Sequence, residues 1–149
     1  MKNLFIFLFV TIFALACNSS DPYQKSREIY QQTMDLHDEV MPRMGEVLSV
    51  KHSLKMKIDS VSDPALKTEI DSAMEALDRT YNGMMSWMAD LQPVPDKNTV
   101  KKNGEIENQK IPSPDEMSKI QQKSLDEIKA LKEQMDKSLK NGKDLLNKF

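Results

Sequence analysis

The sequence predicts an all-α protein with three long helices in an antiparallel, coiled-coil-like bundle, preceded by an N-terminal export segment. Three segments each carry apolar residues at steps of three and four, which is the spacing of one helix face. A helix-start signal precedes each segment. The chain has only four glycines, 30% charged residues and 6% aromatic residues, a composition that suits long solvated helices better than a sheet.

Residues 1–16 are typical of a signal peptide. Lys2 supplies a positive charge, and residues 4–16 are apolar except for Thr11. The apolar stretch is too short to span a bilayer, because a spanning helix needs about 20 apolar residues. We therefore expect residues 1–16 to be removed on export.

Cys17 is the expected lipid-attachment site. Ala14-Leu15-Ala16-Cys17 resembles the bacterial lipobox, although Ala14 stands where leucine is usual. Cys17 is the only cysteine, and acylation would give a role to an unpaired thiol outside the cell. Two or three acyl chains hold a protein stably on a membrane. Residues 17–21 would be the lipidated tether, and the alternative is an ordinary signal peptide that happens to contain a cysteine.

The mature chain is long enough for one domain and is slightly acidic. Removing 16 residues leaves 133, and removing Lys2 leaves a formal charge of 20 − 23 = −3. This near-balance provides no basic face for nucleic acid.

Residues 22–91 are predicted to form a helical hairpin. Asp21-Pro22-Tyr23-Gln24 provides a start signal for the first helix, and Asp63-Pro64 provides one for the second. The short connection around Ser62 favours an antiparallel arrangement. Pro42 interrupts the first helix, so a kink is expected there.

A long flexible loop over residues 92–112 is expected to precede a third helix over residues 113–149. The loop is rich in Pro, Asn and Lys, with Asn103-Gly104 as its expected turn. Ser113-Pro114-Asp115-Glu116 has the pattern of a capping box. The direction of the third helix is left open. Its buried stripe is expected to end at Phe149, and two exposed i,i+4 ion pairs are expected on it, Glu133–Lys137 and Asp136–Lys140.

Methionines gather on the two helices of the hairpin. In a hairpin that turns near residue 62, facing residues have numbers that sum to about 124, so His37 should face Trp87. The favoured interpretation is that methionine fills a core around the proline kink. The alternative is a soft-metal or haem site, since thioether and imidazole groups bind Cu(I) and haem iron. The candidate ligands are His37, Met34, Met41, Met84 and Met88.

No catalytic motif accompanies these residues. The sequence lacks a GxGxxG, P-loop, HExxH or GxSxG pattern. His52 lies between lysines, which favours a solvated position. We expect a non-enzymatic protein that has no cofactor unless the copper or haem alternative holds.

Two segments carry a resemblance to a known group of proteins. His37-Asp38-Glu39-Val40-Met41-Pro42-Arg43-Met44-Gly45-Glu46, within Tyr30–Val47, and Met84-Met85-Ser86-Trp87-Met88 resemble small lipoproteins of Bacteroidetes, some of which carry the label "viral A-type inclusion protein". The resemblance covers most of the mature chain. It implies a helical lipoprotein of the cell envelope and implies no activity.

The sequence as a whole indicates a helical lipoprotein held on a membrane of the cell envelope by acyl chains on Cys17. We expect it to bind another envelope protein, with the outer membrane as its location and the leaflet left open. The alternative function is a periplasmic Cu(I)- or haem-binding bundle. The partner's identity and the oligomeric state stay open.

Overall fold

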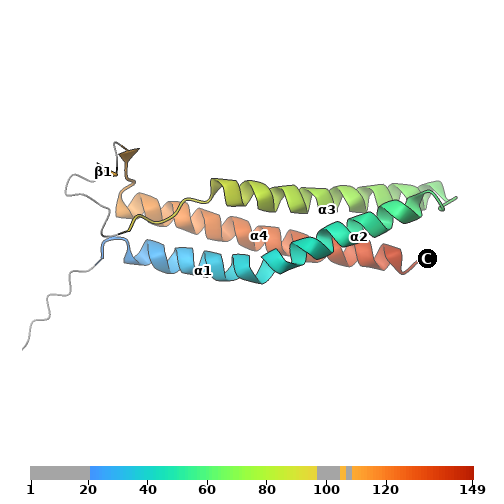
Figure 1. The fold of residues 1–149 in the computed structure, drawn as a ribbon, viewed down its shortest axis with the longest axis horizontal. Helices are drawn as coiled ribbons and strands as arrows, with labels where there is room; N and C mark the ends of the chain where they lie inside the picture. Colours follow the sequence, from blue (N-terminus) through green and yellow to red (C-terminus); the bar gives the residue numbers. More distant parts are fainter. Residues whose placement is uncertain (1–20, 97–104, 107–108) are drawn as a thin grey trace, which may run out of the picture.

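The protein folds into a three-helix bundle whose first helix is broken in the middle (Figure 1). The computed structural model describes residues 21–96, 105–106 and 109–149. The first pass comprises α1 (Gln24–Val40), the 3-10 turn η1 (Met41–Arg43) and α2 (Met44–Ile58), and the other two passes are α3 (Pro64–Asp90) and α4 (Pro114–Leu146). The predicted all-α class with three packed helices is confirmed.

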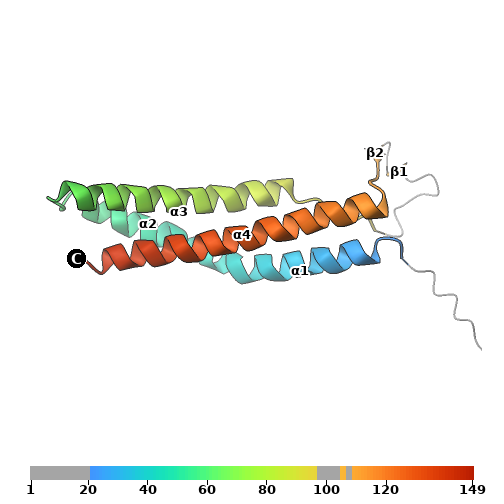
Figure 2. The same cartoon turned by 180° about the vertical axis from the view of Figure 1, so that it is seen from behind.

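Contacts between the helices give the direction of each pass. Residue numbers rise together across α1 and α4, where Glu39 pairs with Lys132, and across η1 and α4, where Arg43 pairs with Asp136. Across the first pass and α3 they run in opposite senses, because Lys51 of α2 pairs with Asp78 whereas the earlier His37 of α1 meets the later Met88. The third pass therefore follows the direction of the first. Figures 1 and 2 show the C-terminus at the end of the bundle opposite the start of α1.

Two of the three predicted helix starts are confirmed. The Asp63 carboxylate accepts the Ala65 N–H at 2.9 Å. Ser113 and Glu116 form the full capping box, with backbone-to-side-chain distances of 2.8 and 3.3 Å. The first start was placed two residues too early: α1 begins at Gln24, and Asp21 instead accepts the Tyr23 N–H in the preceding turn. Asp21 also pairs with Arg27, and this ion pair competes with its use as a cap.

Pro42 breaks the first helix, as predicted. Proline has no N–H to donate and its ring clashes with the preceding turn, and the chain passes through η1 at this point. The break changes the helix direction (Figure 1), so that α1 packs on α4 while α2 packs on both α3 and α4. The buried residues Val40 and Met44 hold the two sides of the break in the core.

The core runs the length of the bundle and includes several polar groups. Its fully buried large side chains include Leu54, Ile70, Leu77, Met84, Ile128 and Met135. The hydroxyls of Thr80 and Ser138 meet at 3.1 Å between α3 and α4. Gln121 is completely buried, and its amide nitrogen donates to the Gln92 carbonyl at 2.8 Å. Phe149, expected in the third stripe, is 48% exposed because α4 ends at Leu146.

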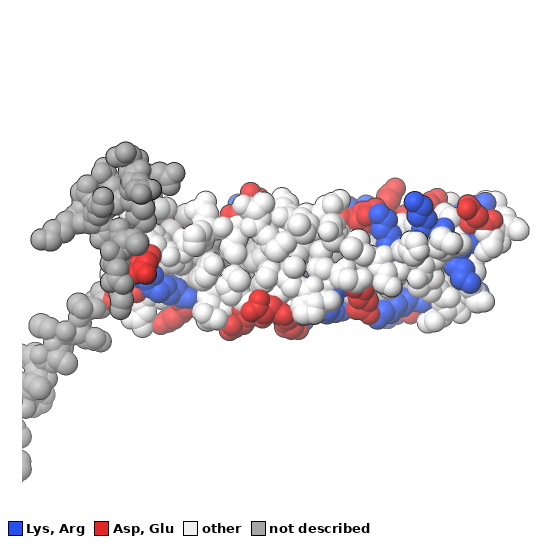
Figure 3. All heavy atoms as spheres, in the orientation of Figure 1, with Lys and Arg blue, Asp and Glu red and all other residues white. Residues whose placement is uncertain are grey.

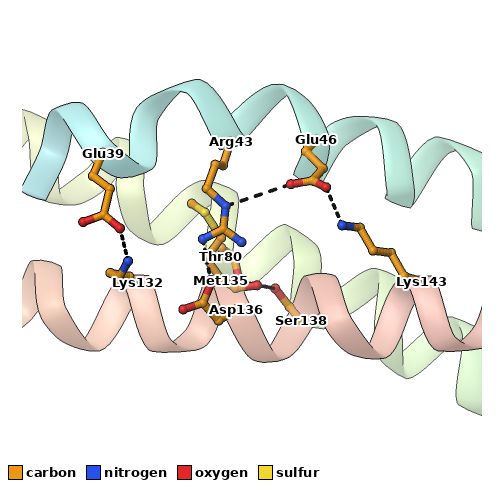
Figure 4. Close-up of polar contacts among 9 residues, drawn as sticks. All are labelled: Glu39, Arg43, Glu46, Thr80, Lys132, Met135, Asp136, Ser138 and Lys143. Carbon is orange, nitrogen blue, oxygen red and sulfur yellow. Dashed lines mark hydrogen bonds and ion pairs between the residues drawn. The ribbon is translucent and has the colours of Figure 1, made fainter.

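A row of ion pairs joins the first pass to α4 (Figure 4). Glu39 meets Lys132, Arg43 meets Asp136 at 2.6 Å, and Glu46 meets Lys143 at 2.5 Å. Arg43 also lies 4.0 Å from Glu46, which links two of these pairs. The expected pairing of Asp136 with Lys140 is wrong, because Asp136 bonds to Arg43 on another helix and Lys140 bonds to Asp144.

The segment between α3 and α4 contains a small hairpin in its described part. β1 (Glu105–Ile106) pairs with β2 (Gln109–Lys110). The expected turn at Asn103-Gly104, the signal peptide and Cys17 lie outside the described residues. Among the helices that the structure describes, none combines the length and the apolar character needed to cross a bilayer.

Candidate functional site

His37, Trp87 and Met88 form the centre of the candidate site, where α1 meets α3. The His37 and Trp87 rings stack with centroids 5.9 Å apart and an interplanar angle of 27°. The Nε2 atom of His37 lies 3.4 Å from the Met88 Sδ atom. The predicted pairing of His37 with Trp87 across the hairpin is therefore confirmed.

Asp38 orients the His37 ring. Its carboxylate oxygen lies 3.0 Å from His37 Nδ1, although the Asp38 side chain is 77% exposed. A neutral imidazole donates through one nitrogen only. If Nδ1–H donates to Asp38, the lone pair of Nε2 faces Met88. Asp38 was not among the candidate residues predicted from the sequence, and its position next to His37 was the signal that could have found it.

Trp87 fixes the site against α4. Its indole N–H donates to the Ser124 carbonyl at 3.1 Å, and its side chain is buried. Because this bond satisfies the only polar atom of the indole, Trp87 is held as part of the core. The face of its ring is then presented to His37.

The four candidate methionines occupy three different environments. Met84 is fully buried in the core, whereas Met88 is half-buried beside His37. Met34 and Met41 are half-buried at positions i−3 and i+4 from His37, which places them on the same helix face. The structure thus brings Met88 into contact with His37 and buries Met84 away from solvent.

Arg27 ties the start of α1 to the end of α3. Its guanidinium donates to the Asp21 carboxylate at 2.5 and 2.8 Å and to the Pro95 carbonyl at 2.6 Å. The hydrogen bond that Arg27 donates to Asp21 raises the pKa of Arg27 above its ordinary value despite partial burial. On the same end of the bundle, the Tyr23 hydroxyl donates to the Pro112 carbonyl at 2.9 Å. These contacts hold the ends of the site's helices in place.

The distance between His37 and Met88 tests which metal groups could fit. With metal–nitrogen and metal–sulfur bonds of about 2.0 and 2.3 Å, ligands on opposite sides of a metal lie roughly 4.3 Å apart. The observed 3.4 Å is too short for that arrangement, so haem held between His37 and Met88 does not fit. The same distance fits a bent angle of about 104° at those bond lengths, as in trigonal or tetrahedral coordination. Within the described residues, no group of three His, Cys, Asp or Glu side chains could hold a metal ion.

A groove of about 540 Å³ runs between α3 and α4 and is lined by residues of both charges, among them Arg79, Glu133 and Lys137. Two smaller hollows between the same helices are lined in part by Trp87. None of the candidate ligands lines the larger groove. This groove and the His37 cluster are therefore separate surfaces.

Comparisons with known proteins identified no match for this chain. No protein-family model, curated protein or solved structure matches the chain.

Proposed function

We propose that this protein is a lipoprotein of the bacterial cell envelope, tethered to a membrane by acyl chains on Cys17, whose helical bundle binds another envelope protein. The observation that carries the proposal is the N-terminal sequence, in which an apolar export segment ends at Ala16 and is followed by the only cysteine of the chain. The outer membrane is the proposed location. The resemblance to small Bacteroidetes lipoproteins supports the same assignment.

The short sequence between Cys17 and the first helix also supports a tether. The turn before α1 starts at Asp21, and α1 begins at Gln24. Three residues lie between Cys17 and Asp21, so four steps along the chain join them, and an extended chain covers at most about 3.6 Å per step. The bundle would then be held within roughly 15 Å of the acyl chains.

Metabolic labelling tests the anchor. Cells producing the full-length chain are grown with an alkyne-bearing fatty acid, and the purified protein is examined for label and for its N-terminal residue. We expect label on a chain that begins at Cys17, and none on the Cys17→Ser variant. An unlabelled wild-type chain, or one cut elsewhere, would reject the anchor.

Photo-crosslinking in intact cells tests the binding of a protein partner. A photoreactive amino acid is placed at exposed positions around the bundle, including Met85 on α3 and Gln122 on α4. We expect one face to yield a discrete, reproducible adduct with a second polypeptide. If no position yields such an adduct, the proposed role in protein binding is wrong, whatever the result for acylation.

A second candidate function is the binding of Cu(I), favoured by the contact between His37 Nε2 and Met88 Sδ. The Asp38 contact to Nδ1 supports it, because histidines that ligate metals commonly donate their other N–H to a carboxylate. Imidazole and thioether groups are suitable ligands for Cu(I). Met34 and Met41, on the same face of the first pass, are the further ligands proposed. Met84 is a poor candidate because it is buried in the core.

Competition with a chelator of comparable affinity tests Cu(I) binding. We expect the wild-type chain to withdraw one Cu(I), and the His37→Ala and Met88→Ala variants to lose most of that capacity. Met56→Ala is the matched control, because Met56 is 68% exposed on α2 and distant in sequence from the cluster. Equal transfer to all four proteins, or none to the wild type, would exclude this function.

A further inference from the structure

Two rows of mostly apolar, half-buried side chains, one on α1 and η1 and one on α3, meet at His37 and Met88, and we call them together the methionine face. On the first pass its residues follow steps of four, three and four, and on α3 steps of four and three, so each row shares one side of its helix. Contact between His37 and Met88 joins the two rows. The face comprises Tyr30, Met34, His37 and Met41 on the first pass, with Tyr81, Met85 and Met88 on α3.

The methionine face is accessible to a partner. Met85 is 45% exposed, and the His37 side chain is 18% exposed. The other five residues of the face are partly buried. Figure 3 shows this part of the bundle, over α1 and the adjoining half of α3, as a surface almost free of charged side chains. From Tyr30 to Met41 the row spans about 16 Å, the length of three helical turns.

Acidic residues predominate along the methionine face. Residues 28–42 contain Glu28, Asp35, Asp38 and Glu39 and no Lys or Arg, and residues 80–96 contain two aspartates and no Lys or Arg. Beyond the two ends of the first-pass row, Arg27 pairs with Asp21 and Arg43 pairs with Asp136. Glu39 is turned toward Lys132 of α4, whereas Asp35 and Asp38 are exposed. Figure 3 shows mainly acidic side chains along the α1 edge of the uncharged surface, with basic ones toward its ends.

This charge pattern selects among three occupants. A second copy of the face would oppose one acidic border with another, and like charges across an interface are unfavourable. An anionic membrane surface attracts Lys and Arg, whereas this border is mainly acidic. A helix with an apolar stripe flanked by Lys or Arg would satisfy both the apolar surface and its border. Flexible methionine side chains adapt well to such a helix.

We propose that the methionine face is the docking site for a basic amphipathic helix of a partner protein. The inference rests on the proposed function as a membrane-tethered binding module and adds the site and the chemistry of the partner. Apolar side chains of the incoming helix pack between the rows of α1 and α3, and its Lys or Arg side chains meet Asp35 and Asp38. The groove between α3 and α4 has linings of both charges and serves as a control surface.

Designed peptides provide the probe. The protein is the whole mature chain from residue 17 with Cys17→Ser, so that no acyl chain competes for the apolar surface. One 18-residue helical peptide carries a leucine stripe flanked by lysines, and its matched partner carries glutamates in place of the lysines. Binding is measured by calorimetry and by the emission of Trp87, the only tryptophan of the chain. We expect the lysine peptide to bind, with an affinity that falls as salt is raised, and the glutamate peptide to bind at least about tenfold more weakly.

Two pairs of variants locate the binding surface. Met85→Lys should raise the Kd for the lysine peptide at least about tenfold, because it replaces an apolar contact with a repelling charge. Met56→Lys, an exposed methionine outside the face, should leave the Kd unchanged. Asp35→Lys with Asp38→Lys should weaken binding about tenfold at low salt. Asp71→Lys with Glu133→Lys, which reverses two exposed acids elsewhere, should have no comparable effect.

Several outcomes would overturn the inference. Equal binding of the two peptides would remove the charge argument, and equal effects of Met85→Lys and Met56→Lys would remove the site. Dimerisation that Met85→Lys abolishes would identify a second copy as the occupant. The comparison of peptides and the salt dependence require no variant, so they decide even if a variant fails to fold. A labelled Cys17 with a cross-linked partner at another face would sustain the proposed function while this inference failed.

Discussion

Gly142 lies where α4 packs closely against both α2 and α3. A Cβ atom at this position would lie 2.6 Å from Val50 Cγ1 and 3.4 Å from Leu77 Cδ1. Valine is stiff about χ1, so the Val50 methyl group cannot swing away at little cost. Gly142 is therefore required for close packing of the three passes, and this explains why a glycine occupies a buried position in the last turns of a long helix.

Gly142→Ala should lower the free energy of unfolding by about 1–3 kcal/mol, because it overpacks the contact with Val50. Urea unfolding followed by circular dichroism measures the change. Gly45→Ala is the matched control, because no atom lies within 4 Å of its added Cβ. That variant should be neutral or more stable by up to about 1 kcal/mol, since alanine favours helix over glycine. Equal losses in the two variants would contradict the packing argument.

The buried contact between Thr80 and Ser138 leads to a second prediction. Thr80→Val should destabilise the protein by about 1 kcal/mol, because the Ser138 hydroxyl loses its partner on α3. Adding Ser138→Ala to that variant should cost little more, giving a clear coupling energy in a double-mutant cycle. Thr68→Val, at an exposed position on the same helix, is the control. Additive effects of Thr80→Val and Ser138→Ala would show that the contact contributes nothing.

The burial of polar residues in the core was not predicted from the sequence. Stripes of apolar residues at helical spacing correctly placed Ile70, Leu77 and Ile128 in the core. The same rule passed over Gln121 and Ser138, which are equally buried. Their burial depends on hydrogen bonds to the Gln92 carbonyl and the Thr80 hydroxyl on other parts of the chain. A local pattern contains no information about such partners.

The start of α4 is formed by residues that are close neighbours in the sequence. Ser113 and Glu116 satisfy each other's backbone N–H groups, and Pro114 stands at the first helical position. Ser113→Ala should lower the free energy of unfolding by about 1 kcal/mol, because an orphan N–H loses its acceptor. Ser72→Ala, an exposed position inside α3, should be neutral or slightly stabilising. An unchanged denaturation midpoint for Ser113→Ala would show that the cap is not needed.

The ion pairs between the first pass and α4 are expected to hold these two helices in register. Asp136→Arg places a positive charge opposite Arg43 and should destabilise by less than about 1 kcal/mol, because the pair is half-exposed. Exchanging the charges with Arg43→Asp and Asp136→Arg should recover part of that loss. Thermal unfolding at low and high salt measures both effects. If the exchanged pair recovers none of the lost stability at low salt, the pair does not couple the helices.

Some features of the helices were predictable from the sequence, and others were not. The helix starts at Asp63 and Ser113 and the break at Pro42 follow from neighbouring residues, and the sequence predicted all three. The start at Asp21 was misplaced because its carboxylate bonds to Arg27, one turn into the helix. Asp136 was assigned to Lys140 by helical spacing, although its partner Arg43 lies 93 residues away. In both cases a competing partner decided the outcome.

The whole molecule combines a helical bundle with a proposed anchor at Cys17, which is not among the described residues. The core described above is built by residues from Tyr23 onward. Cys17→Ser should therefore move the protein from the membrane to the soluble fraction while leaving its thermal unfolding midpoint unchanged. Fractionation of cells and melting of the purified mature chains measure the two effects. Retention of the variant on the membrane would mean that another part of the chain holds it there.

Only part of the candidate site was predicted from the sequence. The sum rule for a hairpin correctly brought His37 to Trp87, because α1 and α3 lie together over that stretch. It could not show that Met84 faces the core while Met88 faces His37, since both follow the same apolar spacing. The distinction depends on how far each helix is rotated about its axis, which the third pass determines by packing against both.

The three passes of the bundle determine how far the end of α4 lies from the start of α1. The chain enters the bundle at one end and leaves it at the other (Figure 1), and the 33 residues of α4 rise by about 50 Å. If lipid holds the first end, the bundle is a rigid spacer, and Phe149 lies at its far end together with the turn between α2 and α3. An epitope fused after Phe149 would then sample a layer far from the bilayer, whereas the same epitope in the segment between α3 and α4 would stay near it.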